Sequence, residues 1–280
     1  MSVQRRPGWA PDEVDIDTPS TARMYDYYLG GSHNFAADRQ LAEQALRAWP
    51  DAQHLVRANR AFLRRAVSFL AHRVDQFLDL GAGIPTVGAV HEVAREKNPR
   101  ARTVYVDCDQ VAVAHSRRIL AAVPGAGVVH ADLRDSAAVL AAVETAGLLD
   151  LRRPVAVLMF AVLPFVPDED DPAGIVAAYR DATAPGSYLA LSHGTDDYRP
   201  QNARAVGEVY TRASHTMTLR SRTQIAALLD GYELVEPGLV DLTCWRPEPD
   251  GGLPDPLGGD VQRYSMYAAV GWLPQGAADA

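Results

Sequence analysis

A glycine turn directly after a short apolar run is the feature of this sequence that most clearly points to chemistry. Residues 77–86 read FLDLGAGIPT, and the first four suit a buried strand. Gly81 and Gly83 follow at once, where a backbone without side chains can turn tightly against a bound ligand. We therefore take Asp79, Gly81, Ala82 and Gly83 as candidate cofactor contacts. The alternative is that the two glycines only satisfy the geometry of the turn.

A second apolar run, 103–106, ends in Asp107. An acid at the tip of the strand that follows a glycine turn is typical of α/β proteins that bind adenosine-type ligands, because its carboxylate accepts both ribose hydroxyls. Asp109 lies two positions later and can cap the next helix. We assign the ribose to Asp107, with the adjoining Cys108 as a further contact, and the helix cap to Asp109.

A third candidate lies at residues 128–133, which read VVHADL. Asp132 can accept the adenine amino group, and Leu133 offers a backbone N–H to the ring. The alternative for Asp132 is a turn or the start of the next helix. Features after three successive strands fall at the same edge of a parallel sheet, and ligands bind at that edge.

The glycine pattern discriminates between cofactors. Pro85 and Thr86 stand where a dinucleotide fingerprint has its third glycine, which permits close packing beneath a pyrophosphate. The missing glycine disfavours NAD and FAD but is compatible with S-adenosylmethionine, which has no phosphate. Thr86 is included among the candidate contacts, although a helix N-cap also explains it.

The rest of the chain predicts the elements that position these residues. Strands are expected at 76–80, 103–107, 127–131, 154–160 and 186–192, with helices near 86–97, 109–122, 135–146 and 171–183. Two further strands, 232–245 and 262–272, are joined by a loop rich in proline and glycine. This order predicts an α/β fold, the Rossmann-like fold of class I methyltransferases, with a seven-stranded, mostly parallel sheet ending in an antiparallel hairpin. Residues 1–74 are expected to form a helical cap on the core, 75–273 the cofactor-binding domain and 274–280 a flexible tail.

Composition narrows the classes of partner. The chain has 280 residues, 48% of them apolar, and a formal net charge of −8. A negative balance disfavours nucleic acid as a partner, because such binding depends on Lys and Arg neutralising phosphates. No apolar run is long enough to span a bilayer, and the N-terminus has no apolar signal region. Two cysteines are too few for a disulfide framework, so we expect a cytoplasmic protein with a small-molecule acceptor and no membrane partner.

With these residues in view, the chain resembles class I S-adenosylmethionine-dependent methyltransferases, and more narrowly an actinobacterial family long known as a domain of unknown function. The segments that carry the resemblance are TARMYDYYLGGSHNFAADR (21–39), ANRAFLRRAV (58–67), QFLDLGAGIPT (76–86), VYVDCD (104–109), ADLRD (131–135) and LVEPGLV (234–240).

The resemblance implies cofactor contacts at Gly81, Asp107, Asp132 and Leu133. It adds a lid beside the methionine part of the cofactor, formed by Tyr27, Tyr28, Gly30, Gly31 and Asn34. Aromatic rings facing a sulfonium gain cation–π energy, which fits such a lid. The alternative is that the tyrosines only anchor the cap on the core.

Methyl transfer can rest on alignment and desolvation, because the sulfonium is already a good leaving group. A base is needed only where the acceptor must lose a proton. His193, after the fifth strand, is the candidate we select, with Asp196 and His33 as further possibilities. Phe165 lies in Leu-Pro-Phe where the resemblance leads us to expect Leu-His-Phe, and Phe165 and Trp245 are candidate walls for the acceptor. No cluster has metal-ligand spacing.

The sequence therefore supports S-adenosylmethionine-dependent methyl transfer to a small-molecule acceptor. A regulatory or partner protein that binds the cofactor without transferring its methyl group is the alternative. A nicotinamide-dependent oxidoreductase ranks third, because the third glycine is missing and the sheet is expected to end in a hairpin.

Overall fold

Short apolar runs form the sheet that organises the molecule, which we describe from a computed structural model covering residues 15–85, 88–247 and 256–274. Five parallel strands make its centre, namely β1 (Gln76–Leu80), β2 (Arg102–Asp107), β3 (Ala126–His130), β4 (Ala156–Phe160) and β5 (Tyr188–Gly194). The last long strand, β8 (Met266–Trp272), runs antiparallel to β5. The order is β3-β2-β1-β4-β5-β8-β6, which confirms the predicted fold class.

The sixth predicted strand differs from expectation, because residues 232–245 do not form one continuous element. They contain two short strands, β6 (Glu233–Leu234) and β7 (Val240–Asp241), both antiparallel to β8, so the sheet formed by the described residues has eight strands and not seven. Pro237 between them lacks an N–H for the ladder, and Gly238 has a φ of +87°. After β7 the chain enters a 3₁₀ turn, η3 (Leu242–Cys244).

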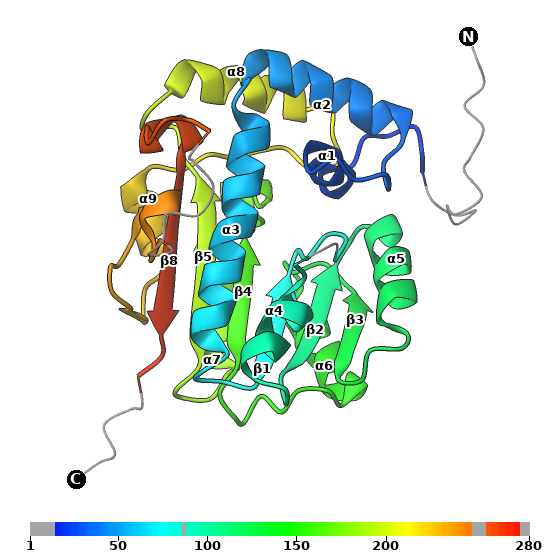
Figure 1. Ribbon diagram of the computed structural model, residues 1–280, viewed down its shortest axis with the longest axis vertical. Helices are drawn as coiled ribbons and strands as arrows, with labels where there is room; N and C mark the ends of the chain where they lie inside the picture. The colour runs from blue at the N-terminus through cyan, green and yellow to red at the C-terminus, as the bar shows by residue number, and fades with distance from the viewer. Residues whose placement is uncertain (1–14, 86–87, 248–255, 275–280) are drawn as a thin grey trace.

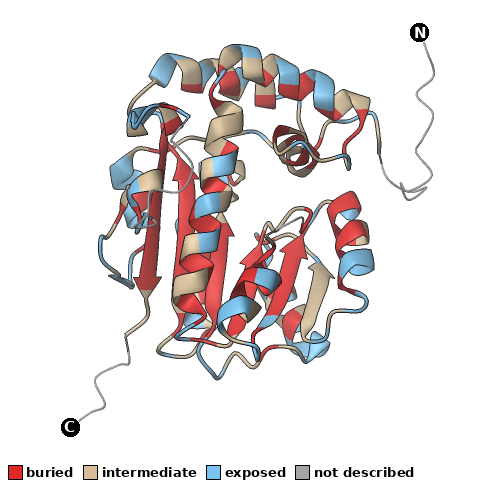
Figure 2. Cartoon of the chain, viewed as in Figure 1, coloured by how far each residue is buried: buried red, intermediate tan, exposed pale blue. Residues whose placement is uncertain are grey.

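Side chains alternate between two apolar layers on opposite faces of the sheet. On one face, β1 and β2 pack against α3 (Ala52–Leu70) and α4 (Val90–Lys97) through Phe77 and Tyr105. On the other face, Leu78 and Val104 join a cluster formed with α6 (Ser136–Ala146), α7 (Pro172–Asp181) and α9 (Arg222–Ala227). The long helix α3 crosses one face in Figure 1, and Figure 2 shows the buried strands between the helices.

A helical cap covers the carboxyl ends of the parallel strands. It contains α1 (Thr21–Tyr28), α2 (Ala36–Ala48), the start of α3 and α8 (Pro200–Tyr210). Met24, Leu41 and Val206 share its apolar centre, so α8 from the middle of the chain packs with the N-terminal helices. In Figure 1 the cap lies across the top of the molecule, and α1 faces the tips of β1 and β2.

The predictions did not include α8 and α9, although α8 carries a recognisable signal. Its buried residues Ala203, Val206 and Tyr210 recur at helical spacing on one face. Its partner, α2, lies more than a hundred and fifty residues earlier in the chain, and only the tertiary structure shows that the two pack together. The remaining helix, α5 (Gln110–Leu120), follows β2 and supports the cap from below.

Candidate functional site

A cavity of about 480 Å³ lies between the carboxyl ends of the parallel strands and helix α1. A volume of this size is typical of sites that enclose one drug-sized ligand. Residues predicted from the sequence line it at four places along the sheet edge. They are Asp79, Gly81, Ala82, Gly83, Asp107, Cys108, Asp132, Leu133 and Phe165. The structure thus brings into one cavity the glycine turn, the acid that ends β2 and the turn after β3.

The glycine turn is fixed by hydrogen bonds to the end of β2. The amides of Gly81 and Ala82 both donate to the carbonyl of Val106, at 2.9 and 3.1 Å. Gly81 and Gly83 have φ values of +69° and +61°, which favour glycine at both positions. The turn therefore presents bare backbone to the cavity. Thr86, the remaining candidate in this motif, lies outside the described residues.

Asp107 closes the turn from the end of β2. Its Oδ2 accepts the Gly83 N–H at 2.7 Å and its Oδ1 accepts the Asp109 N–H at 2.8 Å. Burial raises the pKa of this carboxyl to about 6, although both hydrogen bonds favour its ionised form. A carboxylate held in this way is oriented before any ligand arrives.

Asp79 and Arg60 face the cavity as a pair of opposite charges. The pKa of Asp79 is raised to about 7, mainly by burial, with the Arg60 guanidinium acting in the opposite direction and the negative charge of Asp107 adding to the rise. The Nη2 group of Arg60 is buried and has no hydrogen-bond partner among the described residues. A buried donor without an acceptor is costly, so Arg60 is suited to a ligand carboxylate. Arg60 is not among the candidates that the sequence indicated.

The turn after β3 is stabilised by an ion pair that the sequence did not indicate. Arg134 contacts both oxygens of Asp132, with Nη2 at 2.6 Å from Oδ2, and its Nη1 reaches Asp170 at 2.8 Å. The carbonyl of Leu133 accepts the hydroxyl of Tyr179 at 2.8 Å. Asp132 and Leu133 are consequently fixed in position at the cavity edge.

The N-terminal motif contributes to the cavity through residues other than those implied by the resemblance. Tyr25, Asp26 and Leu29 line the cavity, whereas Tyr27, Tyr28, Gly30, Gly31 and Asn34 do not. Tyr25 and Leu29 share one face of α1 at a spacing of four residues. Tyr27 reaches Glu43 on α2, and Tyr28 contacts Tyr210 on α8, so both tyrosines anchor the cap.

The two glycines of this motif serve a turn around Asp26. A β-carbon at Gly31 would overlap the carboxylate of Asp26, and Gly30 has a φ of +81°. Asp26 Oδ2 in turn accepts the backbone N–H of His33 and the side-chain amide of Asn34, both at 2.8 Å. Gly31 is therefore required by the packing of the turn, and Gly30 by its backbone angle.

His193 does not have the position expected of a catalytic base. It is fully buried and does not line the cavity. Its Nδ1 lies 2.7 Å from the Gly194 carbonyl, and its Nε2 lies 2.9 Å from Nη1 of Arg220. Because the carbonyl only accepts and the guanidinium only donates, the ring is neutral with its proton on Nδ1. Burial lowers its pKa to about 3, in agreement with this state.

His193 instead supports a wall of the cavity through Arg220. The guanidinium of this buried arginine also donates to the carbonyls of Leu163 and Val166, at 3.0 and 2.7 Å. These residues belong to the segment after β4 that carries Phe165 into the cavity. The two remaining candidate bases, Asp196 and His33, are absent from the cavity lining. The described histidine that does line it, His215, lies on the segment after α8 and was not predicted.

The two predicted acceptor walls have different positions. Phe165 lines the cavity and contacts the ring of Tyr210, with centroids 5.7 Å apart. Trp245 is wholly buried between α3 and the sheet, where its ring meets Phe62 and Phe69 edge-on at 5.5 and 5.7 Å. The 3₁₀ turn after β7 directs Trp245 into the core, so it cannot contact a ligand in this cavity.

The sheet order and the acid-lined cavity at its carboxyl edge define a class I S-adenosylmethionine-dependent methyltransferase. Residues 7–274 match the family model described as S-adenosyl methyltransferase, and the chain belongs to this family. It is thus an enzyme that uses S-adenosylmethionine as its methyl donor. No curated protein sequence matches the chain.

Solved structures agree with this assignment. A protein of a domain-of-unknown-function family from Streptomyces avermitilis is 38% identical, with a TM-score of 0.87, over 93% of this chain and 99% of that one. A candidate methyltransferase from Thermobifida fusca is 36% identical, with a TM-score of 0.88, over 96% of this chain and all of that one. The N-methyltransferase NodS from Bradyrhizobium japonicum, solved with S-adenosyl-L-homocysteine, shares the fold at 14% identity and a TM-score of 0.50, over 90% of this chain and all of that one.

Two further observations concern the described part of the chain. None of its groups of histidine, cysteine and acidic residues has an arrangement that could hold a metal ion. None of its helices combines the length and the apolar character that crossing a bilayer requires.

Proposed function

We propose that this enzyme transfers the methyl group of S-adenosylmethionine to a small molecule bound between α1 and the segment after β4. The observation that carries the proposal is the cavity of about 480 Å³, lined at one side by the acids and glycines of the sheet edge. The cofactor occupies part of this volume, and the remainder is sized for a small acceptor.

The cofactor orientation follows from the chemistry of the lining. Asp107 accepts the ribose hydroxyls, and the turn at Asp132 and Leu133 receives the adenine. At the other end, Arg60 binds the carboxylate of the methionine part and Asp79 binds its ammonium group. This arrangement provides an acceptor for the buried Nη2 of Arg60 and a positive partner for Asp79.

The acceptor side is largely apolar. Leu29, directly after α1, lines the cavity together with Val162, Phe165 and Val166 from the segment after β4, and Tyr25 adds a polar edge. Apolar walls exclude water from the transferring methyl group and hold the acceptor in line with the sulfonium. Tyr25 is itself fixed by Asn59, whose Nδ2 donates to the tyrosine oxygen at 3.1 Å. We therefore expect an acceptor with an apolar or aromatic body.

Fractionating a native extract tests the acceptor class. The purified enzyme is incubated with S-adenosylmethionine and either the small-molecule or the macromolecular fraction, and release of S-adenosylhomocysteine is measured against a control without extract. We expect release above the control with the small-molecule fraction. Release only with the macromolecular fraction would contradict a small-molecule acceptor. An Asp107→Ala variant serves as the inactive reference, because it loses the ribose contact.

A further inference from the structure

Asp109 connects three parts of the molecule that are otherwise separate. Its Oδ1 accepts the Ala112 N–H at 2.9 Å and caps α5, as the sequence predicts. Its backbone N–H donates to Asp107, the proposed ribose ligand, at 2.8 Å. Its Oδ2 accepts the hydroxyl of Ser20 at 2.5 Å and lies 3.4 Å from Nη1 of Arg23, and both residues belong to the cap.

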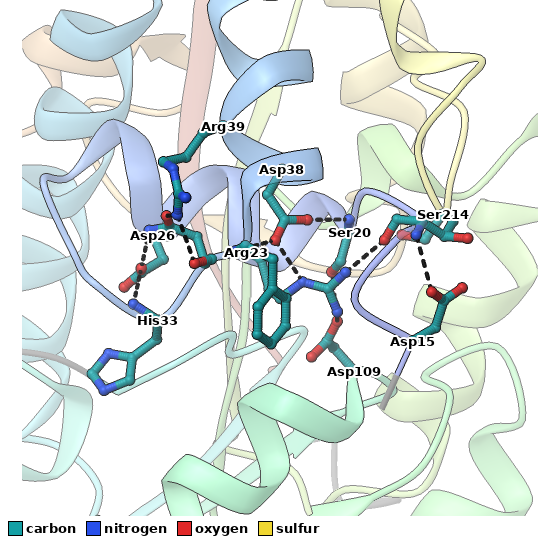
Figure 3. A network of polar contacts seen from close by, with 12 residues as sticks. Asp15, Ser20, Arg23, Asp26, His33, Asp38, Arg39, Asp109 and Ser214 are labelled. Atoms are coloured by element: carbon teal, nitrogen blue, oxygen red, sulfur yellow. Dashed lines mark hydrogen bonds and ion pairs between the residues drawn. The ribbon is translucent and has the colours of Figure 1, made fainter. Parts of the chain in front are cut away.

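The cap side of this contact is held rigidly by its own hydrogen bonds (Figure 3). Arg23 is buried, and its guanidinium donates to Asp38 at 2.9 Å and to the carbonyl of Thr18 at 2.6 Å. Asp38 is wholly buried and also accepts the backbone N–H groups of Ser20 and Phe35, at 2.8 and 2.7 Å. Among the contacts of Arg23 with the described residues, that with Asp109 alone reaches outside this cap segment, residues 15–38.

The same cap segment contacts α5 at two other places. Phe35 and Val111 are both buried and form an apolar contact to which Ile16 adds. The rings of His33 and His115 meet edge-on, with centroids 4.0 Å apart. Residues 15–38 therefore dock on the amino-terminal half of α5, and this helix begins directly after Asp109. A movement of the cap must displace the first turn of α5 or break these contacts.

We propose that Asp109 is a positioning residue that couples docking of residues 15–38 to the geometry of the cofactor site. The route is short, from Ser20 and Arg23 to Asp109, then to Asp107 and the Gly83 amide. Coupling between two equilibria is reciprocal. A docked cap therefore orders the carboxylate of Asp107, and a ligand on Asp107 stabilises the docked cap. The effect on cofactor binding rests on the proposed function, whereas the effect on docking of residues 15–38 does not.

The substitution Asp109→Asn separates the contact of Asp109 with Ser20 and Arg23 from its role as the N-cap of α5. Asparagine caps helices as well as aspartate does, so the contact with Ala112 is retained. The amide nitrogen that replaces Oδ2 cannot accept from Ser20 or Arg23. Asp135→Asn is the control for the helix cap, because Asp135 caps α6 through the same contact with Ala138, at 3.0 Å, and unlike Asp109 does not line the cavity.

Two measurements test the proposal. Hydrogen exchange of the ligand-free protein reports on residues 20–38 and on the glycine turn at 81–84, and calorimetry measures the affinity for S-adenosylhomocysteine. We expect Asp109→Asn to speed exchange in both segments and to weaken the affinity about tenfold, the scale of one hydrogen bond to a charged group. Asp135→Asn should do neither. Ser20→Ala combined with Asp109→Asn should have a smaller effect than the sum of the two single variants, because both change the same contact.

Three outcomes would overturn the inference. One is unchanged exchange at residues 20–38, which would show that Asp109 does not hold the cap. Another is faster exchange at residues 20–38 with unchanged exchange at residues 81–84, which would show that the two segments are not coupled. The third is an equal effect of Asp135→Asn. If the wild-type protein itself fails to bind S-adenosylhomocysteine, the proposed cofactor site fails, and exchange at residues 81–84 still decides whether Asp109 couples the two segments.

Discussion

Gly81 faces Val162 so closely that any side chain at this position would force Val162 to move. A β-carbon at Gly81 would overlap Cγ2 of Val162 and lie 2.7 Å from its Cβ. At Gly83 the same addition meets no atom within 4 Å. The first glycine is thus required by the packing of β1 against the segment after β4, and the second only by its backbone angle.

This difference predicts unequal effects of two alanine substitutions. Gly83→Ala should cost about 1–2 kcal/mol of stability, from placing alanine in the left-handed region. Gly81→Ala should cost about 1–3 kcal/mol more, because Val162 must also move. Denaturant unfolding of both variants measures the two losses. Adding Val162→Ala should recover part of the loss at Gly81 and none at Gly83; equal losses at both positions would refute the packing argument.

Arg60→Ala should weaken binding of S-adenosylhomocysteine by about 1.5–3 kcal/mol, because a buried charged donor loses its carboxylate partner. Methylthioadenosine lacks the amino-acid tail, so its affinity should be unchanged. Calorimetry with both ligands separates the two effects. Arg64→Ala is the control on the same helix, since Arg64 forms an exposed pair with Glu96, and such pairs contribute little. An equal loss of affinity for both ligands would show that Arg60 stabilises the fold of the site and does not bind the amino-acid tail.

Cofactor affinity should rise with pH through the range in which Asp79 loses its proton. The folded protein holds this proton up to a pKa of about 7, against an ordinary value of 3.8. Its contribution to stability is therefore greatest below 3.8 and is lost as the pH rises through 7. A cofactor ammonium binds the ionised form, so affinity should increase by up to about tenfold per pH unit below pH 7 and then level off. Calorimetry across this pH range measures the affinity, and Asp79→Asn should remove the part of its pH dependence that is due to this residue.

His193→Ala should affect stability and leave the chemistry of methyl transfer intact. Removing the ring deprives the buried Arg220 of one acceptor, which costs about 1–3 kcal/mol. The affinity for S-adenosylhomocysteine should be unchanged, because His193 does not line the cavity. Thermal unfolding and calorimetry measure the two quantities. Loss of turnover at full stability would restore the catalytic role that the sequence suggested.

The class of the fold and the edge at which the site lies could be predicted from local patterns of residues. Apolar runs followed by Gly81, by Asp107 and by the Asp132 turn are local patterns, and their place at the carboxyl ends of parallel strands follows from the topology. The helix-cap role of Asp109 was predictable for the same reason, because an N-cap contact spans only three residues.

Which side chains beyond that edge reach the cavity depends on how the helices and the cap pack on the sheet. Trp245 and His193 have suitable types and positions along the chain, but the 3₁₀ turn after β7 and the buried Arg220 direct them into the core. Arg60 and the contact of Ser20 with Asp109 are set by how α3 and the cap dock on the sheet. Such contacts join residues far apart in the chain, and their geometry depends on the packing of whole elements, which no local pattern of residues encodes.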